Sequence, residues 1–309
     1  MTRSSPRSYT GNIKGLENTS VLFQRAADIP HKIEEGSADI GITGLDRFLE
    51  LRSDGGDSKV AIEALGFGNC ELVIAVPDSW VDVDSMYDLA DVATDFRENG
   101  KELRIATKYP RIVQKHLFAH GINYYSMVQS SGTLEAAPSI GFADVIADIS
   151  SSGTTIRENR LKTIDGGSIL TSQACIIVNK KTLNQDVDAL KSAKILLEYV
   201  EAYIRARNFF SITANIQGSS AEVISKNLAA QPDITGLKGP TISKVYGKDD
   251  DIWYAITIVV PRDMLMKAVD HIRNIGGGSV TVSREDYVFE SECVSYMGLV
   301  ESVSRSRLV

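Results

Sequence analysis

The first two thirds of the chain alternate between short apolar blocks and amphipathic stretches. Apolar runs of the kind that form buried strands are separated by segments whose apolar residues recur at helical spacing. Glycine or proline stands at many block ends, where a strand or helix is expected to stop. The predicted strands are 19–24, 38–43, 60–65, 71–76, 103–106, 122–128, 143–149 and 168–178, and the predicted helices are 27–35, 44–51, 85–99, 110–119 and one that begins at 133–137.

Alternation of strands and helices at short spacing favours parallel strands in sheets that are covered on both faces. Two long strand regions, near 60–76 and 169–178, are candidates for crossings between two lobes. A cleft between the lobes would then hold a ligand. The pattern thus predicts an α/β fold in two lobes.

The last third has a different order of predicted strands and helices, and we place a domain boundary near Asn208. A long helix over 183–208 leads to a unit with the order βαββαβ, which is the order of a ferredoxin-like regulatory domain. Its predicted strands are 211–216, 241–246, 253–260 and 279–283, its predicted helices are 221–230 and 264–275, and further β structure is expected over 287–300.

Composition narrows the class of protein. The chain has 309 residues, 43% of them apolar, and a net charge of −7, so it lacks the basic field of a general nucleic-acid binder. The three cysteines (Cys70, Cys175 and Cys293) lie far apart, which argues against a disulfide framework or a structural zinc site. No apolar run approaches a membrane span, and the basic, serine-rich start has no apolar core like that of a secretory signal.

The most informative segment runs from Asp144 to Thr155 and reads DVIADISSSGTT. An apolar strand ends at Asp148, and a tract of small hydroxyl residues around Gly153 follows it. Free backbone amides and hydroxyls in such a tract can converge on a phosphate, and a carboxylate just upstream can take sugar hydroxyls. A sugar-phosphate site at the carboxyl end of a strand is one interpretation. A Ser/Thr-rich surface loop is the other.

Several segments in order resemble one family, ATP phosphoribosyltransferase, in its long form with a C-terminal regulatory domain. The likeness covers nearly the whole chain from about Pro6. It rests on FQR (23–25) with DI (28–29), ADIGITGLD (38–46), ALGFGNC (64–70), ATKYP (106–110), GTLEAAP (132–138), the loop 148–155 and GPTIS (239–243).

The resemblance implies the fold and the reaction. It implies a periplasmic-binding-protein-like part with mixed sheets and a cleft over 1–208, with lobe I at about 1–76 and 168–208 and lobe II at about 77–167. A ferredoxin-like (ACT-like) domain would cover 209–309. ATP and phosphoribosyl pyrophosphate, with Mg²⁺, would give N1-(5-phosphoribosyl)-ATP and pyrophosphate, the first step of histidine biosynthesis.

The resemblance also implies roles for individual residues. Asp148 would bind ribose hydroxyls, and Glu135 would contact the ribose or metal-bound water. The 5-phosphate would lie in the loop of Ser151, Ser152, Gly153, Thr154 and Thr155. Contacts to ATP or to the diphosphate are expected from Arg25, Asp46, Lys108 and Tyr109. No residue is singled out as a ligand of Mg²⁺, which would be held mostly by pyrophosphate oxygens and water.

Each of these residues has a plainer alternative role. Glu135 can be a helix N-terminal charge, and Arg25 can form a surface salt bridge. Asp46 can cap a helix or face solvent, and packing is the preferred alternative for Tyr109.

By the same resemblance, histidine would bind the regulatory unit as a feedback inhibitor between neighbouring subunits. Thr241 and Ser279 are the candidate contacts, with ordinary strand-edge hydroxyls as their alternative role. The resemblance suggests a homo-oligomer, a dimer that stacks into a hexamer. A cytoplasmic location is expected, or the plastid stroma if a transit peptide has been removed.

The sequence departs from the family pattern at its start. Family members usually begin with a strand, a Pro-Ser-Lys-Gly-Arg loop and a helix upstream of the segment that Pro6 to Tyr9 matches. A shortened sequence, an incomplete gene model and a genuine variant are the three explanations. If the omission is real, we expect weak or absent catalysis. Two further hypotheses follow: a catalytically impaired regulatory subunit that retains histidine binding, and a solute-binding module, which the ADIGITG pattern also suits.

Overall fold

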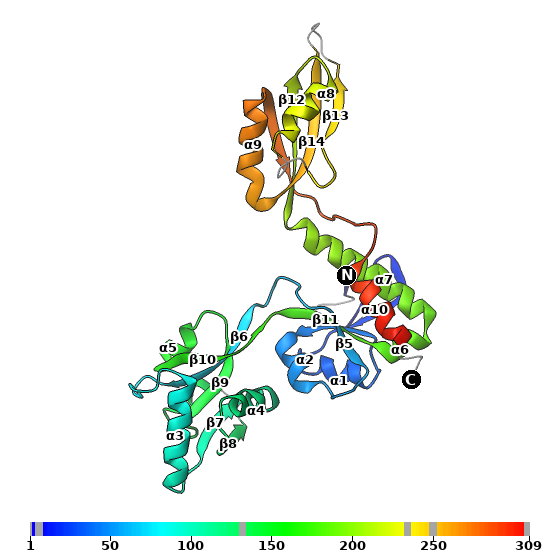
Figure 1. The fold of residues 1–309 in the computed structure, drawn as a ribbon. Coiled ribbons are helices and arrows are strands. Elements are labelled where there is room, and N and C mark those ends of the chain that lie inside the picture. The colour runs from blue at the N-terminus through cyan, green and yellow to red at the C-terminus, as the bar shows by residue number, and fades with distance from the viewer. Residues whose placement is uncertain (1, 4–8, 130–133, 232–235, 247–251, 306–309) are drawn as a thin grey trace. The chain divides into compact units, whose positions relative to one another are not determined.

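The computed structural model describes residues 2–3, 9–129, 134–231, 236–246 and 252–305. The chain divides into two compact units, one formed by 1–193 with 298–309 and the other by 194–297 (Figure 1). This division falls inside helix α7 (Val187–Ala206), upstream of the boundary expected near Asn208. In the described part, no helix has both the length and the apolar character that crossing a membrane requires.

The first lobe of the larger unit is built on a three-stranded antiparallel sheet. β11 (Ala174–Asn179) is its central strand, between β4 (Ile40–Gly44) and β5 (Ser58–Ile62). The expected parallel pairing is therefore wrong for this lobe, because its central strand comes from a distant part of the chain. Helices α1 (Ile29–Glu34) and α2 (Leu45–Leu51) pack on the sheet around a core of Ile33, Leu45, Phe48, Cys175 and Ile177.

The second lobe carries a five-stranded mixed sheet in the order β10-β6-β9-β7-β8. Its parallel pairs are β7 with β8 and with β9, and its antiparallel pairs are β6 with β9 and with β10. The expected parallel strands are thus confined to one side of this sheet. The strands are β6 (Cys70–Pro77), β7 (Leu103–Thr107), β8 (Tyr125–Gln129), β9 (Val145–Ser150) and β10 (Leu161–Ser172).

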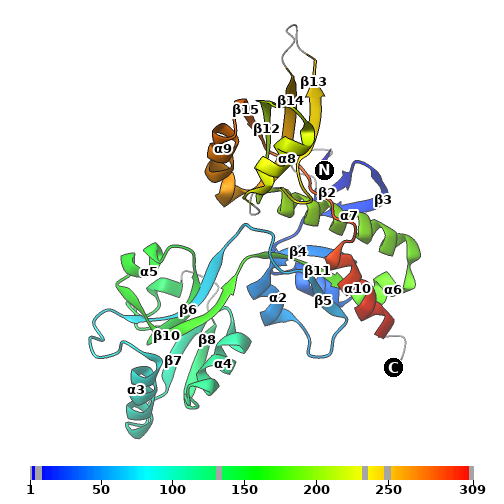
Figure 2. The same ribbon diagram turned by 45° about the horizontal axis from the view of Figure 1, so that its top comes forward.

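The described part of this lobe also has helices α3 (Met86–Glu98), α4 (Pro110–Ala119) and α5 (Thr154–Glu158) and a 3₁₀ turn, Leu134–Ala136. Ser85 caps α3 in a reciprocal capping box with Asp88. The chain crosses between the lobes from β5 to β6 and again from β10 to β11, as expected (Figure 2). The second predicted crossing strand, 168–178, is two strands that meet at Gln173.

Three further parts of the chain differ from the sequence-based elements. An antiparallel sheet of β1 (Thr2–Arg3), β2 (Thr10–Ile13) and β3 (Leu16–Leu22) opens the chain. The helix predicted over 183–208 is broken into α6 (Lys180–Gln185) and α7, because Asp186 leaves helical geometry and its carboxylate accepts from the amides of Asp188 and Ala189.

The β structure expected over 287–300 is wrong, since 287–293 form no strand and α10 (Val294–Arg305) occupies the second half of that range. The carboxylate of Glu201 accepts from the amides of Val294 and Ser295, which satisfies donors in the first turn of α10. Leu299 and Val303, four residues apart, are buried on one face.

The smaller unit has the expected βαββαβ order and a four-stranded antiparallel sheet ordered β13-β14-β12-β15. Alternate strand residues such as Ile212, Ile256 and Ile258 pack against α8 and α9, which cover one face (Figure 1). The elements are β12 (Phe209–Gln217), α8 (Ala221–Ala229), β13 (Thr241–Val245), β14 (Trp253–Pro261), α9 (Leu265–Asn274) after a 3₁₀ turn, and β15 (Gly277–Ser283).

Candidate active site

The predicted site residues of the larger unit come from strand-to-helix connections. Arg25 lies between β3 and α1, Asp46 at the start of α2, and Lys108 between β7 and α4. Asp148 is near the end of β9. The segment from Ser151 to Thr155, called the hydroxyl loop below, leads from β9 into the start of α5. Strand ends are where open α/β sheets place ligands.

Asp148 is a partly buried carboxylate in a mixed electrostatic environment. Burial raises its pKa above the usual value, and the negative charge of Glu135 acts in the same direction. A hydrogen bond of 2.9 Å from the Ile149 amide and the positive charges of Lys108 and Arg47 lower the pKa. The structure therefore brings Asp148, Glu135 and Lys108 into one electrostatic neighbourhood, with Arg47 beside them.

The hydroxyl loop is held in one conformation by its own side chains. The Ser150 hydroxyl accepts from the Gly153 amide at 2.9 Å, and the Ser152 hydroxyl donates to that of Thr154 at 3.0 Å. Gly153 has φ +71°, in the left-handed region that favours glycine. Ser151, Ser152, Thr154 and Thr155 are exposed, so their hydroxyls are open to a ligand.

Helix α5 after this loop has only five residues. So short a helix sums few peptide dipoles, and we assign it little part in holding an anion. The helix dipole considered from the sequence is therefore a minor contribution at most. Any phosphate at this place would be held by the loop's own amides and hydroxyls.

Asp46 and Tyr109 bind each other. The Tyr109 hydroxyl donates to Asp46 Oδ2 at 2.6 Å, and the Ser172 hydroxyl donates to Asp46 Oδ1 at 2.8 Å. Asp46 is 5% exposed and Tyr109 is fully buried, and burial together with the carboxylate raises the pKa of Tyr109. Packing, the alternative preferred for Tyr109, describes its position here. A contact to ATP through the Asp46 carboxylate or the Tyr109 hydroxyl would require the hydrogen bonds described above to break.

Arg47 is a residue that the sequence-based prediction missed. Its guanidinium lies 4.3 Å from the centre of the Tyr109 ring, and its Nε is 3.8 Å from Asp46 Oδ2. It thereby places a second cation, besides Lys108, near Asp148. Arg47 could have been predicted from its position directly after Asp46, because a residue next to a site residue at a strand end also lies close to the site.

The remaining predicted residues of the larger unit are more exposed to solvent than Asp46 and Tyr109. Arg25 is exposed, and its carbonyl accepts from the Asp28 amide at 2.9 Å. Glu135 lies in the 3₁₀ turn Leu134–Ala136 and is half-buried. The neighbouring Gly132 and Thr133 of the recognised motif lie outside the described residues.

Thr241 and Ser279 are exposed and lie on the two outer strands of the sheet of the smaller unit, β13 and β15. Two strands separate them, so they are roughly 14 Å apart or more at the usual strand spacing. Ser279 has φ +50° where the pairing of β15 with β12 shifts register. One small ligand therefore cannot contact both residues of the same chain.

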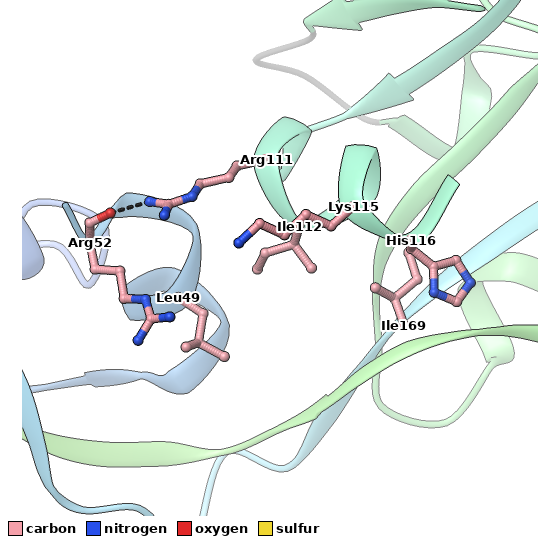
Figure 3. Close-up of a pocket in the computed structure, with 7 residues that line it drawn as sticks. All are labelled: Leu49, Arg52, Arg111, Ile112, Lys115, His116 and Ile169. Atoms are coloured by element: carbon pink, nitrogen blue, oxygen red, sulfur yellow. Dashed lines mark hydrogen bonds between the residues drawn. The ribbon is translucent and has the colours of Figure 1, made fainter. Parts of the chain in front are cut away.

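A pocket of about 360 Å³ lies between α2 and α4 (Figure 3). Leu49, Ile112 and Ile169 supply its apolar wall, and Arg52 and Lys115 supply exposed cations. His116 also lines it, but burial lowers the pKa of His116, and its ring bonds the Gly166 carbonyl at 2.9 Å. The basic charge of this pocket therefore comes from arginine and lysine.

Among the described residues, no group of three or more His, Cys, Asp or Glu side chains could hold a metal ion. The carboxylates of Asp148 and Glu135 remain as oxygen donors of the type that Mg²⁺ prefers. Their number fits an ion that is bound mainly by substrate phosphates and water.

Comparison with known proteins covers both units. A sequence profile of the ATP phosphoribosyltransferase family matches residues 25–201, and one described as the HisG C-terminal domain matches 206–284. ATP phosphoribosyltransferase 2, chloroplastic, of Arabidopsis thaliana is 38% identical over 305 residues, which span 97% of this chain and 73% of that protein. The ATP phosphoribosyltransferase of Rhodopseudomonas palustris (strain BisB18) is 35% identical and covers 93% of this chain and 85% of its own length.

Among solved structures, the ATP phosphoribosyl transferase (HisG:HisZ) complex from Thermotoga maritima is similar at 25% identity and a TM-score of 0.47, over 59% of this chain and 78% of that one. The sequence matches to the family extend through both units in the expected order. The chain belongs to the ATP phosphoribosyltransferase family, in the long form that carries its own C-terminal regulatory domain.

Proposed function

We infer that this chain is an ATP phosphoribosyltransferase, which condenses ATP with phosphoribosyl pyrophosphate in the first step of histidine biosynthesis. The observation that carries this inference is the match of the family over both units, at 38% identity to a relative of that name. A half-buried carboxylate beside an open hydroxyl loop is the local feature that suits a phosphorylated pentose.

The reaction needs alignment and charge stabilisation more than a protein nucleophile. The N1 lone pair of adenine forms the bond to the anomeric carbon, and the bond from that carbon to pyrophosphate breaks with its electron pair on the leaving oxygen. Positive charge grows on the sugar and negative charge on pyrophosphate. Groups arranged in advance for these two charges therefore account for the catalysis.

We assign the growing positive charge to Asp148, which would also hold ribose hydroxyls. The loop from Ser151 to Thr155 would bind the 5-phosphate through amides and hydroxyls. Arg25, Lys108 and Arg47 are the cations proposed for the diphosphate of the donor and the triphosphate of ATP. We propose that Asp46 and Tyr109 shape this site by binding each other.

Mg²⁺ is proposed as the cofactor on the chemistry of the available donors. Asp148 and Glu135 would approach an ion that the diphosphate carries, directly or through water. When bound, the ion would neutralise charge on the leaving pyrophosphate.

We further propose that histidine inhibits the enzyme through the smaller unit. The placement of Thr241 and Ser279 on opposite sheet edges supports a site to which two chains contribute one edge each, and hence a homo-oligomer. Inhibition from that site requires two states of the enzyme with different affinities for histidine. For the compartment, the names of two plant relatives that read chloroplastic support the plastid stroma, and the bacterial relatives support the cytoplasm.

Calorimetric titration with phosphoribosyl pyrophosphate, ATP and histidine, combined with an absorbance assay of phosphoribosyl-ATP formation, tests the proposal. We expect binding of all three and turnover that histidine suppresses. Histidine binding without substrate binding would instead identify a regulatory subunit. Failure of all three to bind would overturn the proposed function.

Gly153→Ala is expected to weaken binding of phosphoribosyl pyrophosphate about tenfold, because a side chain at φ +71° costs about 1–2 kcal/mol and shifts the loop. The added Cβ would also approach Arg157 at 3.2 Å. Gly100→Ala is the matched control, since Gly100 has φ +70° with open space around it and ends α3. Calorimetry should show unchanged affinity for the control, and equal weakening in both variants would contradict the assignment.

The acidic limb of the pH profile of kcat/KM is expected to follow Asp148, which acts as a carboxylate and loses activity as the pH falls through its raised pKa. Lys108 lowers that pKa and Glu135 raises it. Lys108→Ala should therefore move the limb to higher pH, and Glu135→Gln should move it to lower pH. Limbs that stay in place in both variants would show that another group controls the profile.

A further inference from the structure

Helix α4 begins without a capping side chain from its own segment. Tyr109 holds the N-cap position without a side-chain hydrogen bond to the helix, and Pro110 has no amide hydrogen. The amides of Arg111 and Ile112 in the first turn therefore need acceptors from elsewhere.

Glu50 supplies those acceptors from the other lobe. Its Oε1 accepts from the Arg111 amide at 2.9 Å, and its Oε2 accepts from the Ile112 amide at 3.0 Å. Glu50 lies on α2 and is 8% exposed. A carboxylate at a helix N-terminus gains both charge-assisted hydrogen bonds and a favourable interaction with the helix dipole.

Two further contacts join the same pair of helices. Asp46 precedes Glu50 by one turn on α2 and accepts from the Tyr109 hydroxyl. The Arg111 guanidinium donates to the Arg52 carbonyl across the pocket that separates α2 from α4 (Figure 3). The start of α4 is thus attached to the first lobe at its backbone and at two side chains.

Lys108 comes just before this attachment. In the parallel pairing of β7 with β9, Thr107 lies opposite Ala147, so Lys108 and Asp148 directly follow paired residues on neighbouring strands. The charge of Lys108 accordingly lowers the pKa of Asp148. We propose that Glu50 is a positioning residue for phosphoribosyl transfer: it caps α4 from the opposite lobe and thereby fixes Lys108 beside Asp148. This role rests on the proposed function, because Lys108 matters to catalysis only if an anionic substrate binds there.

A double-mutant cycle between Glu50 and Lys108 tests the role. Glu50→Ala should lower kcat/KM about tenfold. In the Lys108→Ala background the same change should lower kcat/KM by less than about twofold, because the contribution of Lys108 that Glu50 supports is already lost. Glu50→Gln should restore part of the loss, since its amide oxygen can accept from one of the two amides. Losses that multiply in the double variant would overturn the positioning role.

Glu34 provides the matched control. Its carboxylate accepts from the amides of Asp57 and Ser58 at 3.1 and 3.3 Å, entirely within the first lobe. Glu34→Ala therefore removes a similar set of hydrogen bonds without touching α4, and we expect kcat/KM to stay unchanged. An equal loss in Glu34→Ala would show that the effect of Glu50 is only general stability.

Hydrogen exchange gives a readout that does not depend on turnover. The amides of Arg111 and Ile112 should exchange faster in Glu50→Ala than in the unaltered chain or in Glu34→Ala. Unchanged exchange there would overturn the proposed role of Glu50 whatever the activity. Absence of phosphoribosyl-ATP formation by the unaltered chain would instead overturn the proposed function.

Discussion

Asp148→Asn is expected to lower kcat for phosphoribosyl-ATP formation about 100-fold or more, since it removes the charge that we propose stabilises the developing positive sugar. Asparagine preserves the shape of the side chain and its ability to accept from the Ile149 amide. The change therefore tests the charge itself. Steady-state rates at saturating ATP and phosphoribosyl pyrophosphate would measure the effect.

Asp144 offers a control carboxylate just before the same strand. It binds the guanidinium of Arg104 at 2.8 Å and accepts from the Arg104 amide, which is a structural role. Asp144→Asn should lower stability and leave kcat nearly unchanged. If Asp148→Asn lost no more activity than this control, the assignment of Asp148 as the catalytic carboxylate would be wrong.

Asp46→Ala is expected to lower the free energy of unfolding by about 2–4 kcal/mol, because the buried hydroxyls of Tyr109 and Ser172 both lose their acceptor. The charge of Asp46 also faces Arg47, whose guanidinium is left beside the Tyr109 ring. Urea unfolding of the variant and the unaltered chain would give the difference.

Tyr109→Phe separates the contributions to that contact. It removes one hydroxyl and keeps the ring under Arg47 and the Ser172–Asp46 bond, so about 1 kcal/mol of destabilisation is expected. Asp46→Ala should thus be clearly the more harmful change. Equal losses in the two variants would show that Asp46 acts only through Tyr109.

The sequence predicted those parts of the fold whose signal is local. The apolar run before Asp148 forms β9, and the βαββαβ order of the last third is confirmed. The tract of small hydroxyl residues after Asp148 does form a connection between a strand and a helix. These features depend on a few consecutive residues, and their chemistry can be read directly.

Features that depend on distant residues were not predicted. The acceptors of the first α4 amides come from Glu50, and the cation over Tyr109 comes from Arg47. The sequence pattern over 287–300 predicts β structure where helix α10 begins, and the first turn of α10 is stabilised by Glu201, far away in the sequence. Short sequence patterns do not identify these partners, because the residues become neighbours only in the folded structure.

The placement of β11 at the centre of the first lobe's sheet has a consequence for synthesis on the ribosome. Among the described strands, β4 and β5 pair only with β11, whereas the strands from β6 to β10 pair among themselves. The second lobe can thus form its native strand pairs before β11 is synthesised, whereas β4 and β5 have no native partner until β11 is available. We expect the lobe that emerges first from the exit tunnel to be completed last.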